Sequence, residues 1–203
     1  MLRPLGIRDV VFDLGGVLID WDPRYLLRDH LGLPPEDVER FLATVCTPEW
    51  HGELDAGRPF AAAAAELAGR FPQHREWIEA YCRGWHRMFA GHFPETVALL
   101  DELVAAGYRL HALSNYPAEH VGFLYARFPF MTRFETVVLS GLVGATKPDL
   151  AIYRHLLAGL DGRPALFIDD RAENVAAAKR CGLEALHVDG AQTRRTLREI
   201  LAP

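Results

Sequence analysis

Cysteine is scarce in this chain of 203 residues, and its cysteines lie far apart. There are three, Cys46, Cys82 and Cys181, with no CxxC pair among them. An odd number of widely spaced cysteines argues against a disulfide framework and a zinc cluster, and it favours a reducing compartment, the cytoplasm. We expect each cysteine to be a small buried hydrophobic side chain and not a catalytic thiol.

Long apolar runs and an excess of positive charge are also absent. The apolar N-terminal stretch is interrupted by four aspartates, Asp9, Asp13, Asp20 and Asp22, so we expect neither a signal peptide nor a membrane-spanning helix. The formal net charge is −5, and such a chain has no global field that attracts nucleic acid or an anionic membrane. An anion that binds here must therefore be held by a local site.

Short apolar segments are plentiful, and they predict a buried parallel sheet. They are rich in β-branched and aromatic residues and are unsuited to having either face in water. The segments are 9–13, 109–114, 136–139, 165–169 and 184–188. Helical patterns separate or follow them, one beginning at Pro94 and others covering 150–157, 172–180 and 193–201. This alternation predicts an α/β fold with a doubly wound, parallel, Rossmann-like sheet.

Residues 22–91 differ from the rest of the chain, because they contain helical patterns and no convincing strand. They lie between the first and second predicted strands, so the simplest interpretation is a helical insertion after the first strand. We therefore predict two domains, an α/β core of residues 1–18 and 92–203 and a helical cap domain of residues 19–91, called the insertion below. Nothing in the sequence indicates the oligomeric state.

Polar residues stand where the predicted strands end, which is the edge of a parallel sheet where ligands bind. They are Asp13, Ser114, Asn115, Asp169 and Asp170, with Lys147 in the loop GLVGATKP. Carboxylates gathered at one edge repel one another unless a cation joins them, and Mg²⁺ prefers such hard oxygen ligands. The lysine and the polar side chains could hold a phosphate. The pattern predicts phosphoryl transfer with a carboxylate available for covalent catalysis.

Four segments, VFDLGGVL, LSN, KPDLAIY and FIDDRAEN, resemble in this order the four motifs of the haloacid dehalogenase-like hydrolases. Each motif alone is a weak signal, but four in the right order at strand ends are specific, and the resemblance covers nearly the whole chain. The insertion matches the position of that family's first type of cap. The resemblance implies a Mg²⁺-dependent phosphatase of a small phosphorylated metabolite, such as a sugar phosphate. Within the family, the chain is similar to the group of glucose-1-phosphate phosphatases and epoxide hydrolase N-terminal phosphatases.

The resemblance also implies a role for each matching residue. Asp13 attacks phosphorus and becomes an aspartyl phosphate, while Lys147 offsets charge on the nucleophile and on the phosphoryl oxygens. Ser114 and the Asn115 backbone bind the transferring group.

The acidic motif and its neighbours supply the remaining implied roles. The magnesium ligands are Asp13, the backbone carbonyl of Gly15, Asp170 and Asp169, which also lies close to Lys147. Asn174 is expected to support the acidic loop and to border the substrate.

One departure from the family pattern concerns proton transfer. Most phosphatases of this family carry a second aspartate two residues after the nucleophile, which protonates the leaving group and later activates water. Here that position is Gly15. General acid–base help of this kind is worth about 10²- to 10⁴-fold in rate, so we expect the loss to matter most for poor leaving groups. Asp20, Asp22, His51 and His86 could replace the acid, although structural roles are commoner for such residues.

Two other functions stay open. A 2-haloacid dehalogenase would also use Asp13 as its nucleophile and would lack the second aspartate, but it needs no metal, and the paired acids Asp169 and Asp170 favour a phosphatase. A catalytically weak binding or regulatory protein would have little reason to keep a costly cluster of like charges.

The insertion should choose the substrate. Trp50 is the candidate contact, because it lies in a polar segment, PEWHGELDAGR, that could reach over the active site. Glu53, Asp55 and Arg58 in the same segment could contact a sugar.

Overall fold

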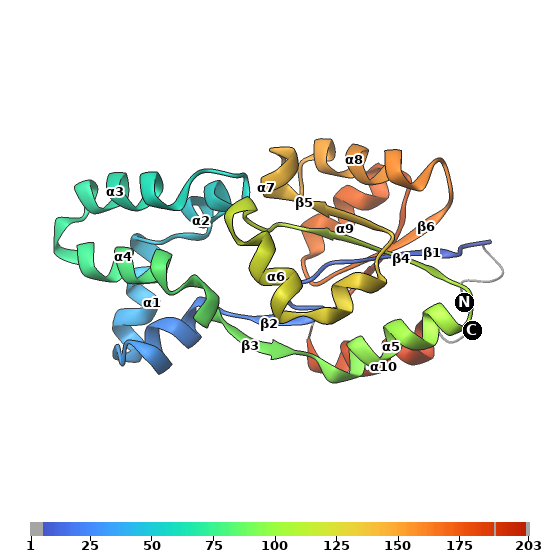
Figure 1. Ribbon diagram of the computed structural model, residues 1–203, viewed down its shortest axis with the longest axis horizontal. Helices are drawn as coiled ribbons and strands as arrows, with labels where there is room; N and C mark the ends of the chain where they lie inside the picture. Colours follow the sequence, from blue (N-terminus) through green and yellow to red (C-terminus); the bar gives the residue numbers. More distant parts are fainter. Residues whose placement is uncertain (1–5, 189, 202–203) are drawn as a thin grey trace.

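A central sheet of five parallel strands forms the core of the computed structural model, which describes residues 6–188 and 190–201 (Figure 1). The strand order is β5-β4-β1-β6-β7, so β1 lies in the middle. The strands are β1 (Asp9–Phe12), β4 (Arg109–Ser114), β5 (Thr136–Leu139), β6 (Ala165–Asp169) and β7 (Glu184–His187). The predicted α/β fold is confirmed, with β1 and β7 each ending one residue earlier than expected. Residues 1–5, 189 and 202–203 of the predicted core lie outside the described residues.

Helices cover both faces of the sheet. One face carries α8 (Leu150–Leu160) and α9 (Ala172–Arg180), and the other carries α5 (Pro94–Ala105) and α10 (Ala191–Leu201) (Figure 1). Val11, Leu113 and Phe167 pack with the first pair, whereas Val10 and Phe12 pack with the second. Two buried faces explain why these strands are apolar at successive positions. Within residues 6–188 and 190–201, no helix is long and apolar enough to cross a membrane.

Shorter helices complete the core. After β4 come η5 (Ala118–His120), α6 (Val121–Arg127) and η6 (Pro129–Arg133), and after β5 comes α7 (Ser140–Val143). They place the connections that follow β4 and β5 beside the insertion (Figure 1). In particular, α7 contacts α2 (Pro48–Asp55) of the insertion.

The insertion begins and ends in an antiparallel ribbon, β2 (Ile19–Trp21) paired with β3 (Phe89–His92). Between these strands lie η2 (Tyr25–His30), α1 (Pro35–Thr44), α2 (Pro48–Asp55), α3 (Phe60–Arg70), η3 (Pro72–His74), α4 (Arg75–Arg83) and η4 (Trp85–Met88). The expectation that residues 22–91 contain no strand was wrong for β3. This strand has a single partner, and its residues alternate between half-buried and exposed. It therefore lacks the apolar run that identifies the buried strands of the core.

Aromatic side chains pack the insertion against the core. The Trp85 ring stacks on His120 at 4.2 Å between centroids and meets Tyr116 edge-on at 5.2 Å. The Phe60 backbone N–H donates to Glu119 Oε1 at 2.9 Å. These contacts hold the insertion beside the residues that follow β4, at the carboxyl edge of the sheet.

Candidate active site

The carboxyl ends of β1, β4 and β6 bring the predicted site residues together. Asp13 follows β1 directly, and its backbone N–H donates to the Ile168 carbonyl at 2.8 Å, which keeps it in line with β6. Ser114 and Asp169 are the last residues of β4 and β6. Asp13, Ser114 and Lys147 line a cavity of about 660 Å³ whose other wall is formed by the insertion.

Lys147 lies at the centre of a buried ion cluster. Its Nζ is 2.8 Å from Asp13 Oδ2 and 2.6 Å from Asp169 Oδ2, and only 1% of its side chain is exposed. Burial opposes the charge, but the two carboxylates outweigh it and raise the pKa of Lys147, so the side chain is a cation at neutral pH. Burial raises the pKa of Asp13, and so do Asp169 and Asp170, against the pull of Lys147. One ammonium group therefore does not balance the carboxylates around it.

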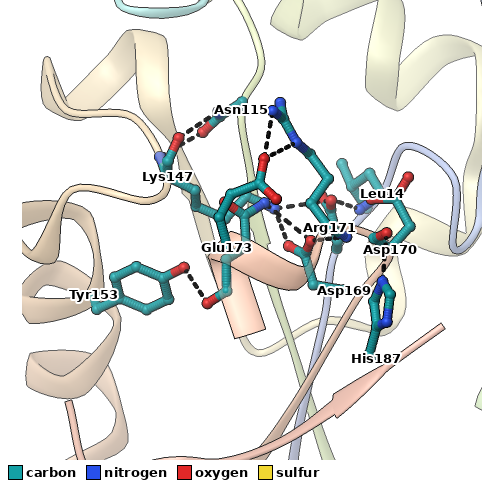
Figure 2. A network of polar contacts seen from close by, with 11 residues as sticks. Leu14, Asn115, Lys147, Tyr153, Asp169, Asp170, Arg171, Glu173 and His187 are labelled. Atoms are coloured by element: carbon teal, nitrogen blue, oxygen red, sulfur yellow. Dashed lines mark hydrogen bonds and ion pairs between the residues drawn. The ribbon is translucent and has the colours of Figure 1, made fainter. Parts of the chain in front are cut away.

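Asp169 accepts hydrogen bonds on both oxygens. Oδ2 accepts from Lys147 Nζ at 2.6 Å, and Oδ1 accepts from the Arg171 backbone N–H and from Asn174 Nδ2, each at 2.9 Å (Figure 2). The backbone carbonyl of Asn174 accepts in turn from the Tyr153 hydroxyl at 2.9 Å. Asn174 thus holds the acidic loop, and it also lines the cavity.

The Asn115 side chain holds the backbone of Lys147. Its Oδ1 accepts from the Lys147 N–H at 2.8 Å, and its Nδ2 donates to the Lys147 carbonyl at 3.1 Å (Figure 2). The Lys147–Pro148 peptide bond is cis. Because the Asn115 side chain is bonded to the Lys147 backbone, the backbone of Asn115 is the part that can make the predicted phosphate contact.

Three carboxylates could hold a metal ion here. Asp13, Asp169 and Asp170 each offer an oxygen within 4.8 Å of the others. Burial raises the pKa of Asp170, and the charge of Asp169 raises it further. A divalent cation would relieve this repulsion, and an all-oxygen donor set fits Mg²⁺. Asp169 is the most fully engaged carboxylate, with three donors on its two oxygens. Asp13 accepts from the Leu14 N–H and contacts Lys147, so the geometry favours Asp13 and Asp170 as the carboxylate ligands.

Gly16 is the backbone position that the Asp170 carboxylate approaches. A Cβ at Gly16 would lie 2.2 Å from Asp170 Oδ2, and the φ of +70° also favours glycine. We expect Gly16→Ala to displace the carboxylate and to weaken Mg²⁺ binding about tenfold, measured by calorimetric titration. Gly32→Ala is the matched control, because Gly32 has a φ of +68° and its Cβ would meet nothing within 4 Å. Equal weakening in both variants would contradict the contact with Asp170.

Trp50 does not line the cavity, contrary to our expectation. It is buried within the insertion, where its ring meets Tyr81 edge-on at 5.8 Å. Its neighbours on α2, Glu49 and His51, line the cavity instead. Successive helical positions point in different directions, and the sequence did not reveal which face of α2 turns toward the core.

The candidates for the missing acid are not equivalent. Asp20, Asp22 and His86 are not among the residues that line the cavity, and the Tyr25 hydroxyl donates to Asp20 Oδ1 at 2.9 Å. His51 lines the cavity, but burial lowers the pKa of His51 to about 4, so its ring is neutral at neutral pH. Its Nδ1 lies 2.9 Å from the Tyr81 hydroxyl.

Asp55 is a cavity-lining acid that the sequence did not distinguish from its neighbours. Glu53, Asp55 and Arg58 were grouped as sugar contacts, but only Asp55 lines the cavity, while Glu53 and Arg58 form an ion pair outside it. The sequence contained one signal for Asp55: it lies four residues after His51, and residues so spaced share a helix face.

Comparison with known proteins agrees with this arrangement. The model of the haloacid dehalogenase-like hydrolase family matches residues 7–182. A sesquiterpene phosphatase of Aspergillus oryzae is 30% identical over 94% of this chain and 95% of its own. A phosphoglycolate phosphatase of Yersinia pseudotuberculosis is 28% identical over 90% and 81%. A HAD-family enzyme of Bacteroides thetaiotaomicron, solved with magnesium and inorganic phosphate, has the same fold, with a TM-score of 0.70 at 21% identity over 92% of this chain and 96% of its own.

Proposed function

The chain belongs to the haloacid dehalogenase-like hydrolase family, and from this premise we propose that it is a Mg²⁺-dependent phosphatase of a small phosphorylated metabolite. The observation that carries the proposal is the buried Lys147 ammonium between Asp13 and Asp169, with Asp170 beside them. A carboxylate next to a fixed cation at the floor of a cavity is suited to attack an electrophilic, negatively charged group.

The positions of these side chains support the following reaction. Asp13 attacks phosphorus, and the ester P–O bond breaks as the alcohol leaves, which forms an aspartyl phosphate. Water then hydrolyses this intermediate and releases inorganic phosphate. Lys147 offsets charge on the nucleophile and on the phosphoryl oxygens, while the Ser114 hydroxyl and the Asn115 backbone bind those oxygens. Asp169 fixes the position of Lys147, because its Oδ2 accepts from the ammonium and its Oδ1 is held by Arg171 and Asn174.

A Mg²⁺ ion would be held by Asp13, Asp170 and the Gly15 carbonyl. When bound, it supplies positive charge that neutralises the phosphoryl group and the nucleophile. Asp169 was also predicted as a ligand, but its hydrogen bonds favour a positioning role. The raised pKa values of Asp13 and Asp170 support this assignment, since a dication would reverse the repulsion that contributes to them.

The rest of the cavity would receive the organic part of the substrate. Its walls carry large apolar side chains, among them Ile19, Trp21, Leu42, Trp85, Phe89 and Tyr116, together with polar ones such as Arg24, Glu49 and His51. This lining suits an alcohol with an apolar portion at least as well as a sugar, and one relative is named a sesquiterpene phosphatase. Glucose 1-phosphate, phosphoglycolate and farnesyl monophosphate therefore form the first substrate panel.

The test is hydrolysis of p-nitrophenyl phosphate with Mg²⁺ and after its removal by a chelator. We expect chelation to lower the rate at least about 10³-fold and added Mg²⁺ to restore it, because a metal ion contributes several kcal/mol of charge stabilisation. Metal-independent chloride release from 2-chloropropionate without phosphatase activity would instead indicate a dehalogenase. Mg²⁺ binding without turnover of any ester would indicate a binding protein.

A further inference from the structure

A poor leaving group has to receive its proton from another residue of the cavity, because position 15 has no side chain. Among the described residues, the carboxylic acids that line it are Asp13, Glu49, Asp55 and Asp170. Asp13 and Asp170 belong to the cation cluster. Glu49 is exposed, and hydrogen bonds from its own backbone and from Thr47 lower its pKa, so it stays ionised. Asp55 is left as the acid that faces the cavity.

The core fixes the position of Asp55. Asp55 is the last residue of α2, and its carbonyl accepts a hydrogen bond from the Ser140 hydroxyl at 2.6 Å. Ser140 Oγ accepts in turn from the Tyr116 N–H at 2.8 Å. Two residues on, Gly57 has a φ of +100° and approaches so closely that its Cβ would lie 3.0 Å from the Gly141 carbonyl oxygen. Asp55 is thus tied to the segment that follows Ser114 and Asn115.

The surroundings of Asp55 keep its carboxyl group able to exchange a proton near neutral pH. The side chain is 14% exposed, and His51 Nε2, at 3.7 Å from Asp55 Oδ1, is neutral and too distant for a hydrogen bond. Burial raises the pKa of Asp55 to about 7, although Lys147 and Arg171 oppose the shift.

The tyrosines near Asp55 keep one protonation state around neutral pH. The tyrosines that face it, Tyr81 on α4 and Tyr116 after β4, have pKa values raised mainly by burial. They remain neutral, so Asp55 is the group among these neighbours that changes charge near neutral pH.

We propose that Asp55 is the general acid and general base of the phosphatase reaction, and that the insertion thereby supplies what Gly15 cannot. The inference rests on the proposed function. As the bond between Asp13 and phosphorus forms and the ester P–O bond breaks, the Asp55 carboxyl gives its proton to the departing alkoxide. The resulting carboxylate then takes a proton from the water that attacks the aspartyl phosphate, so that Asp55 is protonated again and inorganic phosphate leaves.

The test compares p-nitrophenyl, phenyl and benzyl phosphates, whose leaving groups are similar in size and increasingly basic. With the Mg²⁺-loaded enzyme, we expect Asp55→Asn to lower kcat/KM for benzyl phosphate about 10²- to 10³-fold and to lower it progressively less for the better leaving groups. The fall of kcat/KM above about pH 7 for benzyl phosphate should also disappear, since it reports loss of the Asp55 proton. Glu53→Gln, on the outer face of the same helix, should behave as wild type.

Restoring an acid at position 15 gives an independent check. A Cβ at Gly15 would meet nothing within 4 Å, so Gly15→Asp should fit and should recover at least about tenfold of the benzyl phosphate activity of Asp55→Asn. An equal loss of kcat/KM on all three esters, with the fall above about pH 7 still present for benzyl phosphate, would overturn the role of Asp55 even if the variant folds poorly. Absence of Mg²⁺-dependent hydrolysis by the wild type would refute the phosphatase itself, and the inference with it.

Discussion

Replacing Asp13 by asparagine is expected to lower kcat/KM for p-nitrophenyl phosphate at least about 10⁴-fold, because the amide oxygen is a poor nucleophile and forms no stable phosphoryl adduct. Both carboxylate oxygens of Asp13 are engaged, since Oδ1 accepts from the Leu14 N–H at 2.6 Å and Oδ2 lies 2.8 Å from Lys147 Nζ. Asparagine has nearly the same shape, so the loss should come from chemistry and not from misfolding.

A matched control and a direct observation separate these explanations. Asp20→Asn changes another acid of the same segment, one that does not line the cavity, and it is expected to retain activity. Rapid quenching of the wild type during turnover should reveal one added phosphoryl group on the peptide that contains Asp13. Normal turnover by Asp13→Asn, or a phosphoryl group on a different peptide, would contradict the assignment.

The sheet could be predicted because its strands are buried on both faces. Segments 109–114 and 165–169 are largely apolar, and each ends at a polar residue at the carboxyl edge of the sheet. Ser114 lines the cavity, and the buried Asp169 contacts Lys147, which also lines it. Since parallel strands place these ends together, the grouping of Asp13, Ser114 and Asp169 followed from their positions along the chain. No contact between distant segments had to be known beforehand.

The contacts of the insertion could not be predicted in this way. Asp55 depends on Ser140, which is 85 positions further along the chain, and on which face of α2 turns toward the core. The same uncertainty led to the wrong choice of Trp50, whose large apolar ring packs inside the insertion and not against a ligand. Local patterns give the helices, but the face that a short helix presents is decided by long-range packing.

Replacing Lys147 by methionine is expected to lower kcat/KM about 10³-fold, because a fixed cation beside the reacting phosphoryl group is lost. Stability should fall as well. With a fully buried ammonium removed, Asp13 and Asp169 lose their shared partner, and we expect the free energy of unfolding without Mg²⁺ to drop by about 3 kcal/mol.

The pH dependence of the stability of Lys147→Met should show whether Lys147 stabilises the fold through its charge or through packing. Without the ammonium, the pKa of Asp13, already raised by burial and by Asp169 and Asp170, should rise further. The folded state then binds more protons than the unfolded state between the ordinary pKa of an aspartate and the raised value, so stability falls as pH rises through that window. Urea unfolding should therefore show a larger loss of stability relative to wild type at about pH 9 than at about pH 5. Mg²⁺ should recover part of the loss at the higher pH, because it binds only the folded site.

Lys179→Met is the matched control, since Lys179 is the only other lysine in the chain and lies exposed on α9. It should change neither activity nor the pH dependence of unfolding. If Lys147→Met lost the same stability at both pH values, and Mg²⁺ returned none of it, the lysine would contribute through packing of its methylene chain against Phe167, whose ring centroid is 5.5 Å from Nζ. The expected result, a loss that grows with pH and is reversed by a dication, would mean that the site keeps an unbalanced negative charge. Such a charge draws a metal ion to the position where a phosphoryl group must then be bound.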